Sequence, residues 1–205
     1  MKRINSLNDL LMEELSDLLN AESQLVEALP QMAQVVGSPG LKAALEEYQE
    51  ISKEHVRRLD EIFDNIGQNP QRVVCRVIKE LITGCDVAVN KTEKSPDRDT
   101  SIISAAQRME EYEISKYKTA REHAVDLGHT KIVEVFAKTL NEQRAMNLHF
   151  NELAQGMINA QVMEPEGKGF YIPEGKFGRK GVKKKSITDI SRFISEGNPN
   201  TDGSS

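Results

Sequence analysis

Residues 102–120 read IISAAQRMEEYEISKYKTA, and this stretch decides the fold. Its apolar and small side chains recur three or four residues apart, which is the spacing of one face of an α-helix; they stand at positions 102, 106, 109, 117 and 120. Glu113 falls on the same stripe, and Glu110 lies one turn before it. The stretch therefore predicts a long helix over about 98–127 that turns carboxylates toward the interior of a helical bundle.

The rest of the first 160 residues repeats this helical spacing. Apolar stripes predict long helices over about 7–35, 40–66 and 130–158, and a shorter helix over 71–92. Turn-forming residues separate the segments, at 37–40, at Gly67, at 93–97 and at Gly128. Because no stretch shows sustained apolar alternation with β-branched residues, we predict an all-α protein.

The lengths of the links indicate how the helices connect. Four helices of nearly 30 residues are predicted, with short links after the first and third and a connection of roughly 30 residues between the second and third. That connection contains the fifth, shorter helix. One long crossover in a four-helix bundle is typical of ferritin-like folds, which we favour. An up-down bundle with an additional helix on its surface is the alternative topology.

Composition narrows the class of protein. The chain has 205 residues, no Trp and 5% aromatic residues, which argues against a sandwich or barrel with a large aromatic core. A net charge of -5 argues against a nucleic-acid-binding body. No apolar run approaches the roughly 20 residues of a membrane span, and the first residues lack the apolar segment of a secretory signal. Cys75 and Cys85 stand ten residues apart on one predicted helix, too far to bridge, which predicts a cytoplasmic protein with reduced thiols.

A change of composition near residue 160 divides the chain. We predict a helical bundle over 1–160 and a Gly-rich, locally basic tail over 161–205, which holds 7 of the 13 glycines. Within the tail, a capping box that begins at Ser186 and the apolar residues after it predict a short amphipathic helix near 186–196. So short a helix needs a surface on its own body, a dimer mate or another protein. A flexible solvated tail and a tail that contacts nucleic acid are the alternatives.

Charged residues also interrupt the other apolar stripes. Glu22 lies near the middle of the first stripe, and Glu142 lies near the middle of the last. Together with Glu113, they predict that carboxylates from three helices meet inside the bundle. An unpaired buried carboxylate is costly, so such a cluster needs a cation or a proton. Inward Glu and His side chains build carboxylate-bridged metal centres in bundles, and hard oxygen ligands with imidazole suit iron or manganese.

Other residues on the stripes have simpler interpretations. Glu14 is interpreted as an edge residue whose carboxylate stays in water. His55 and His149 are interpreted first as histidines satisfied within the core or an interface, although imidazole is also a metal ligand. Tyr48 is either a packing residue or a hydrogen-bond donor to a carboxylate.

Several stretches resemble one protein family. They are Asp17 with AESQL at 21–25, ALP at 28–30, AAQRMEEYEI at 105–114 and TLNE at 139–142. On these residues, the chain over roughly 5–155 resembles the ferritin-like YciE/YciF family of bacterial stress-associated proteins. The resemblance implies a helical bundle that tends to dimerise and holds a dinuclear metal site between its long helices. By position, Glu22, Glu110, Glu113 and Glu142 match carboxylates of the family.

The second helix departs from the family pattern. The family has a His and, three residues later, a Glu, where this chain has Tyr48 and Ile51. In the last long helix, a second family acid is Gln143 here, and a later Asp is Asn147. His55, one turn beyond Ile51, is a candidate replacement ligand. Alternatively, Ile51 fills the space and the site is degenerate.

These inferences leave three hypotheses of function. The favoured one is a stress-associated ferritin-like protein with a carboxylate-rich iron or manganese site, of one or two metals, that oxidises or detoxifies oxygen or peroxide. In it, Glu113 and Glu142 would bridge or ligate the metals and Glu22 and Glu110 would be terminal ligands. His55 would be a ligand or a donor beside them.

The alternative is a metal-free or degenerate bundle that acts as a dimeric binding or scaffold module through its C-terminal tail. DNA association through the basic tail is a weaker third hypothesis. We expect a homodimer, a protein partner for the tail and no contact with a membrane. Whether the chain is an enzyme stays open at this point.

Overall fold

The computed structural model describes residues 4–163, with side chains for residues 4–157. The chain divides into two units, Met1–Pro165 and Glu166–Ser205. The described residues all belong to the first unit. The basic tail and the amphipathic helix predicted near 186–196 lie outside the described residues.

Five α-helices account for most of the described residues. They are α1 (Leu7–Val35), α2 (Pro39–Ile66), α3 (Arg76–Lys91), α4 (Pro96–Asp126) and α5 (Thr130–Met163). No strand occurs within residues 4–163. The predicted all-α class is therefore confirmed.

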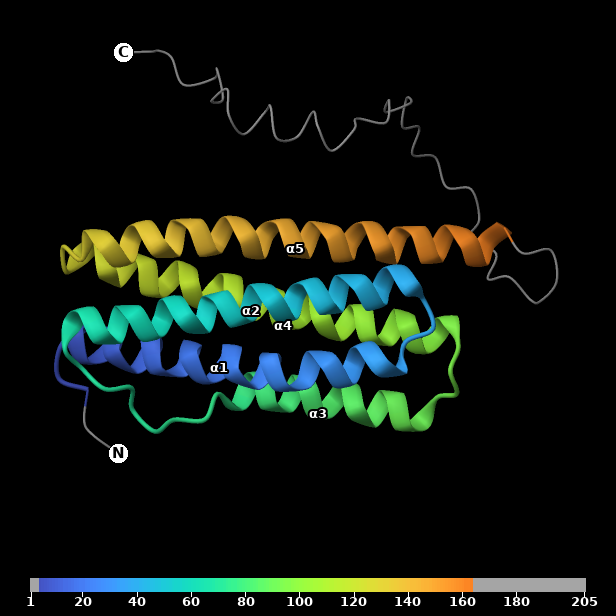
Figure 1. The fold of residues 1–205 in the computed structure, drawn as a ribbon, viewed down its shortest axis with the longest axis horizontal. Coiled ribbons are helices and arrows are strands. Elements are labelled where there is room, and N and C mark those ends of the chain that lie inside the picture. Colours follow the sequence, from blue (N-terminus) through green and yellow to red (C-terminus); the bar gives the residue numbers. More distant parts are fainter. Residues whose placement is uncertain (1–3, 164–205) are drawn as a thin grey trace, which may run out of the picture. The chain divides into compact units, whose positions relative to one another are not determined.

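The helices form two antiparallel hairpins joined by a long crossover (Figure 1). One hairpin is α1 with α2 and the other is α4 with α5; they meet through α1 on α4 and α2 on α5. After α2, the chain runs back along the bundle through α3, which packs on α1 and α4. As a result α2 and α4 run in the same direction (Figure 1). This is the predicted ferritin-like topology, and it excludes the up-down alternative.

The helix ends follow from local chemistry. Ser6, Ser38 and Ser95 cap the N-termini of α1, α2 and α4, because each hydroxyl accepts a hydrogen bond from a backbone N–H in the first turn. Helix α2 ends at Gly67, whose φ of 63° is a left-handed conformation that favours glycine. Gly128 has a φ of 73° and makes the turn between α4 and α5.

Helix α3 begins later than the predicted residue 71. Side chains of α1 instead hold the segment before it, because the Gln71 N–H donates to Ser16 Oγ at 2.9 Å and the Cys75 N–H donates to Asn20 Oδ1 at 2.8 Å. These bonds satisfy backbone donors that would otherwise need a helix. Cys75 therefore precedes α3 instead of lying within it. Cys75 and Cys85 are both buried free thiols.

A buried aspartate ties the two hairpins together at one end. Asp99, in the first turn of α4, accepts hydrogen bonds from the N–H groups of Gly37 at 2.8 Å and Ser38 at 2.7 Å, in the turn between α1 and α2. These bonds fix the turn between α1 and α2 against the start of α4. Charge-assisted bonds of this kind are stronger than neutral ones.

The apolar core is divided into two clusters with polar side chains between them. One cluster includes Leu25, Leu29, Leu45 and Tyr48, and the other includes Leu11, Leu18, Leu59, Tyr117 and Phe136. Each fully buried leucine contributes about 1.5–3 kcal/mol to the free energy of folding. No helix within the described residues is long and apolar enough to cross a membrane.

Candidate metal centre

Three fully buried glutamates meet in the middle of the bundle. Glu22 comes from α1, and Glu110 and Glu113 come from α4. Burial raises the pKa of Glu110 well above its ordinary value, and the charges of Glu113 and Glu22 raise it further. Burial and the charge of Glu22 likewise raise the pKa of Glu113. We call these three residues the carboxylate centre.

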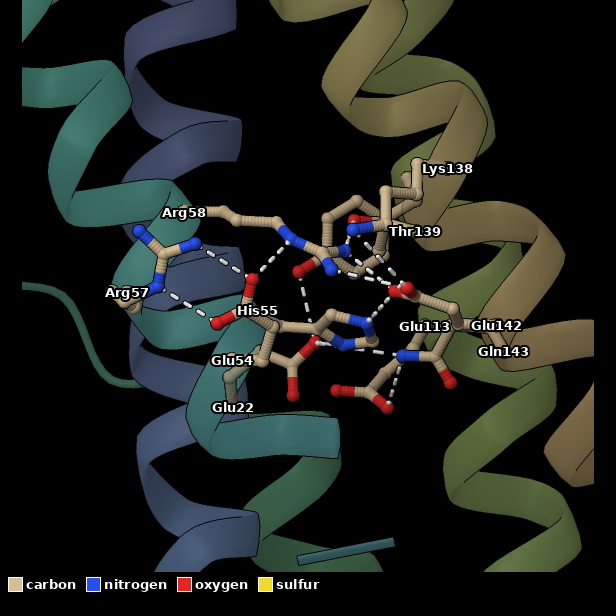
Figure 2. A network of polar contacts seen from close by, with 11 residues as sticks. Glu22, Glu54, His55, Arg57, Arg58, Glu113, Lys138, Thr139, Glu142 and Gln143 are labelled. Carbon is tan, nitrogen blue, oxygen red and sulfur yellow. Dashed lines mark hydrogen bonds and ion pairs between the residues drawn. The ribbon is translucent and has the colours of Figure 1, made fainter. Parts of the chain in front are cut away.

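Glu22 and Glu113 each have one carboxylate oxygen that accepts hydrogen bonds, and the donors come from three helices. Tyr48 O–H of α2 donates to Glu113 Oε2 at 2.8 Å, and Tyr117 O–H of α4 donates to Glu22 Oε1 at 2.8 Å. Gln143 Nε2 of α5 donates to the same Glu113 oxygen at 3.0 Å and lies 3.5 Å from Glu22 Oε1 (Figure 2). Burial raises the pKa of both tyrosines well above 10.0, so they remain donors at neutral pH.

The other oxygens of the centre have no donor. Within the part of the chain that the structure describes, Glu22 Oε2, Glu113 Oε1 and both carboxylate oxygens of Glu110 are buried without a hydrogen-bond partner. The same holds for Gln143 Oε1. A buried acceptor without a partner costs about 1–3 kcal/mol, and more when it is charged. Such unsatisfied acceptors are the groups that a bound cation or shared protons would compensate.

Glu142 has a different environment. Both of its oxygens accept from the guanidinium of Arg58, at 2.5 and 3.0 Å. Arg58 also donates to Glu54 at 3.0 Å and to Thr139 at 3.2 Å (Figure 2). Burial raises the pKa of Glu142, but the hydrogen bonds from Arg58 and His55 outweigh it and the net pKa is lowered. We call Glu54, Arg58, Thr139 and Glu142 the Arg58 network.

His55 joins the two groups. Its Nδ1 lies 2.9 Å from Glu22 Oε1, and its Nε2 lies 3.1 Å from Glu142 Oε2. Burial lowers the pKa of His55, but the two glutamates outweigh burial and the net pKa is raised. Because both ring nitrogens face carboxylate oxygens, neither nitrogen is free to ligate a metal in this arrangement.

The five predicted site residues therefore fall into two sets. Glu22, Glu110 and Glu113 form the carboxylate centre, whereas Glu142 lies in the Arg58 network and His55 bridges the two. Among the described residues, no group of three or more His, Cys, Asp or Glu side chains is arranged to hold a metal ion. Metal binding by these five residues stays a prediction.

Sequence reasoning missed two functional neighbours. Arg58 lies three residues after His55, so its place on the inner face of α2 was available from the spacing. Tyr117 was read as a packing residue, and its hydroxyl was overlooked as a donor. Tyr48 had two predicted roles, and the structure confirms the donor role. Ile51 is partly buried and packs against the apolar cluster around Leu45.

Two other stripe residues differ from their interpretation. The side chain of His149 is 42% exposed, with Nδ1 3.6 Å from Glu47 Oε2, so it lies outside the core, and its place in an interface stays a prediction. Glu14 is nearly buried, and its Oε2 lies 2.7 Å from His123 Nδ1 of α4. Glu14 is therefore satisfied by a partner, where exposure to water was expected.

Comparison with known proteins gives consistent matches. A family model described as a domain of unknown function, DUF892, matches residues 6–163. Protein YciF of Escherichia coli K12 is 29% identical over 160 residues, which are 78% of this chain and 96% of YciF. The crystal structure of that stress protein has a TM-score of 0.74 and covers 76% of this chain and 99% of YciF.

Two further solved structures are similar. YcfI from Rhodopseudomonas palustris is 34% identical, with a TM-score of 0.70 over 73% of this chain and 96% of YcfI. A ferritin-like, diiron-carboxylate protein from Bacillus anthracis is 18% identical, with a TM-score of 0.58 over 74% of this chain and 99% of that protein. At that identity the last match shows the ferritin-like fold alone.

Proposed function

The chain belongs to the DUF892 family, and we propose that it is a stress-associated ferritin-like protein whose bundle core binds iron or manganese. One observation carries the proposal. Within the described residues, the carboxylate centre has four buried carboxylate oxygens with no hydrogen-bond partner, in a layer closed on both sides by apolar clusters. The association with stress rests on the relationship to the stress protein YciF.

The donor atoms are of the chemical kind that a divalent cation of this sort binds. Glu22 Oε2, Glu113 Oε1 and the Glu110 carboxylate would hold it, since hard oxygen ligands suit iron(II) and manganese(II). Bound there, iron or manganese would supply redox chemistry toward oxygen or peroxide. Glu142 and His55, the other two predicted ligands, are placed beside the centre. They would enter the ligand set only by leaving their present partners.

The residues around the centre have separate roles. Tyr48 and Tyr117 each fix one carboxylate oxygen, and the free oxygen of the same carboxylate is thereby oriented. His55 fixes Glu22 from a further side. Phe136 packs against Tyr117 at 5.1 Å between ring centroids and helps to exclude water from this end of the layer.

Metal analysis tests the proposal. Protein purified from cells grown with added iron or manganese should contain metal, and the Glu113→Gln variant should lose it. Glu111→Gln is the matched control, because Glu111 is an exposed carboxylate on the same helix. Metal that is substoichiometric and unchanged by Glu113→Gln would contradict the proposal.

A second candidate is a metal-free bundle that acts as a dimeric binding or scaffold module in the cytoplasm. The donors from Tyr48 and Gln143 on Glu113, and the apolar Ile51 on α2, favour it. Deleting residues 165–205 should then change the number of chains in the oligomer or abolish capture of a protein partner. If both stay unchanged, the tail has no such role.

A further inference from the structure

We propose that α3 unravels on its own between Cys75 and Thr92, while both of its ends stay attached and the four long helices stay folded. Helix α3 lies beside α1 at the edge of the bundle and packs on α1 and α4 (Figure 1). These two helices supply Glu22, Glu110 and Glu113, so the opening of α3 uncovers the helices that form the carboxylate centre. The inference does not depend on a bound metal.

Helix α3 buries few of its side chains. Two of its 16 residues, Ile78 and Cys85, are buried, whereas 11 of the 31 residues of α4 are buried. Val77 and Val87 of α3 are 46% and 45% exposed. A helix of this length is only marginally stable alone, and in a protein most of its stability comes from the packing of its apolar face. Helix α3 is therefore weakly stabilised compared with α4.

Open grooves flank α3 on both sides. The groove between α3 and α1 measures about 230 Å³, and Ile82 of α3 and Ala28 of α1 are among the residues that line it. The groove between α3 and α4 measures about 340 Å³, and its lining includes the small residues Gly84, Ala88, Ser101, Ser104 and Ala105. Small side chains leave these grooves unfilled, so fewer van der Waals contacts hold α3 on its neighbours.

Polar contacts attach the start of α3 to both neighbouring helices. The N–H of Cys75 donates to Asn20 Oδ1 of α1 at 2.8 Å, and its carbonyl accepts from Gln24 Nε2 of α1 at 3.1 Å. Cys75 Sγ lies 3.3 Å from the Tyr112 hydroxyl of α4. The chain is thus fixed at the residue where α3 begins.

The far end of α3 is attached as well, but its middle is not. Arg98 of α4 donates to the carbonyl of Thr92, the residue after α3. Among the described residues, no side-chain hydrogen bond or ion pair joins residues 76–91 to another helix; the hydroxyl of Thr83, for example, donates to the carbonyl of Lys79 within α3. Sixteen helical residues span about 24 Å and the same residues extended reach about 50 Å, so α3 can unravel between fixed ends.

The two cysteines report on different parts of this segment. Cys75 lies at the attached start, Cys85 lies in the middle of α3, and both thiols are buried. Burial raises the pKa of Cys85 to about 11, so in the closed helix this thiol is protonated and unreactive at neutral pH. Reaction of Cys85 with a thiol reagent therefore reports that α3 has opened.

Thiol labelling tests the proposal. The full-length protein is incubated with iodoacetamide at increasing but non-denaturing concentrations of urea, and the modification of each cysteine is followed by peptide mass spectrometry. We expect Cys85 to react at least about tenfold faster than Cys75, with a rate that depends much less on urea than global unfolding does. Equal rates for the two cysteines, or a Cys85 rate that follows global unfolding, would overturn the proposal.

A substitution within α3 separates its unravelling from entry of the reagent through a groove. Gly84→Ala fits the folded helix, because nothing lies within 4 Å of a Cβ atom at that position. Alanine favours the helix over the unravelled chain, so this variant should slow both the labelling of Cys85 and the amide exchange of residues 79–89 by about fivefold. Gly156→Ala in α5, where a Cβ atom also meets nothing within 4 Å, is the matched control and should change neither rate. Unchanged rates in Gly84→Ala would exclude the unravelling of α3.

Discussion

The carboxylate centre and the Arg58 network lie side by side in one polar layer, and the same residue type behaves oppositely in each. The pKa of Glu142 is lowered, whereas the pKa values of Glu110 and Glu113 are raised. Taken by itself, burial would raise the pKa of all three glutamates. The difference is that Glu142 has a guanidinium on both oxygens, and Glu110 has no donor among the described residues. A glutamate on an inner stripe is therefore either neutralised by the chain or left to take up a proton or a cation.

The largest expected effect on stability comes from removing Arg58. Arg58→Met removes the two hydrogen bonds from the guanidinium to Glu142, which keeps only His55 and Lys138 as positive neighbours. We expect the free energy of unfolding to fall by about 2 kcal/mol. Urea denaturation measures this. Arg57→Met is the control, because the Arg57 side chain is 55% exposed, and it should have a much smaller effect. Similar losses in the two variants would show that the buried pair does not carry the difference.

The second largest effect is expected in the pH dependence of stability, to which the carboxylate centre and the Arg58 network contribute differently. Glu110 and Glu113 have raised pKa values in the folded protein, so their contribution is present below the unfolded carboxyl pKa of about 4.3 and is lost as pH rises through the folded pKa. The metal-free protein should therefore lose stability as the pH rises above about 5, by up to about 1.4 kcal/mol per pH unit for each glutamate that is still protonated in the folded protein and already ionised in the unfolded one.

The Arg58 network contributes to the pH dependence of stability in the opposite direction, but outside the pH range of this experiment. Glu142 has a lowered pKa, so its contribution is lost only as the pH falls below the range of the experiment. His55 has a raised pKa and adds to the loss at high pH. Denaturation midpoints in a chelating buffer measure the trend, and stability that rises with pH would contradict it.

A neutral side chain at position 110 should remove part of that trend. Glu110→Gln has the shape of the protonated acid, so at pH 8 without metal we expect a gain of about 1 kcal/mol and a flatter pH profile. Thermal unfolding with and without Mn²⁺ measures both this gain and the loss of stabilisation by metal. Glu111→Gln should change neither. A loss of stability in Glu110→Gln would mean that the ionised form is compensated in the folded protein.

The smallest effect is expected at the outer edge of the Arg58 network. The hydrogen bond from Arg57 lowers the pKa of Glu54 to about 2. The Glu54 side chain is 38% exposed, however, and solvent screens its interactions. Glu54→Gln should therefore change the free energy of unfolding by less than about 0.5 kcal/mol. A change as large as that of Arg58→Met would mean that Glu54, and not Glu142, is the main partner of Arg58.

Much of the fold could be predicted from the sequence. The spacing of apolar residues places Glu22 and Glu113 inside, because an inner stripe recurs every three or four residues whatever the side chain is. Ser6, Ser38 and Ser95 begin helices, and Gly67 ends one, for reasons confined to a single turn. The long link with its own helix identified the crossover.

The details of the site could not be predicted in the same way. Spacing shows which face of α2 carries Arg58, but not that its side chain reaches Glu142 on α5. His149 illustrates a second limit, since a stripe extended in steps of seven residues drifts by about 20° per heptad in a straight helix. Around position 149 the buried residues of α5 are Met146 and Phe150, and the side chain at 149 is partly exposed.

The division of the apolar core has a consequence for how the bundle opens. Each cluster contributes one tyrosine to the polar layer, Tyr48 from one end to Glu113 and Tyr117 from the other end to Glu22. A cation or proton shared by these carboxylates would thus connect the two ends of the four long helices. Backbone amides at both ends should exchange with solvent in a single cooperative step when the carboxylates share a cation or proton, and as two separate blocks when they do not.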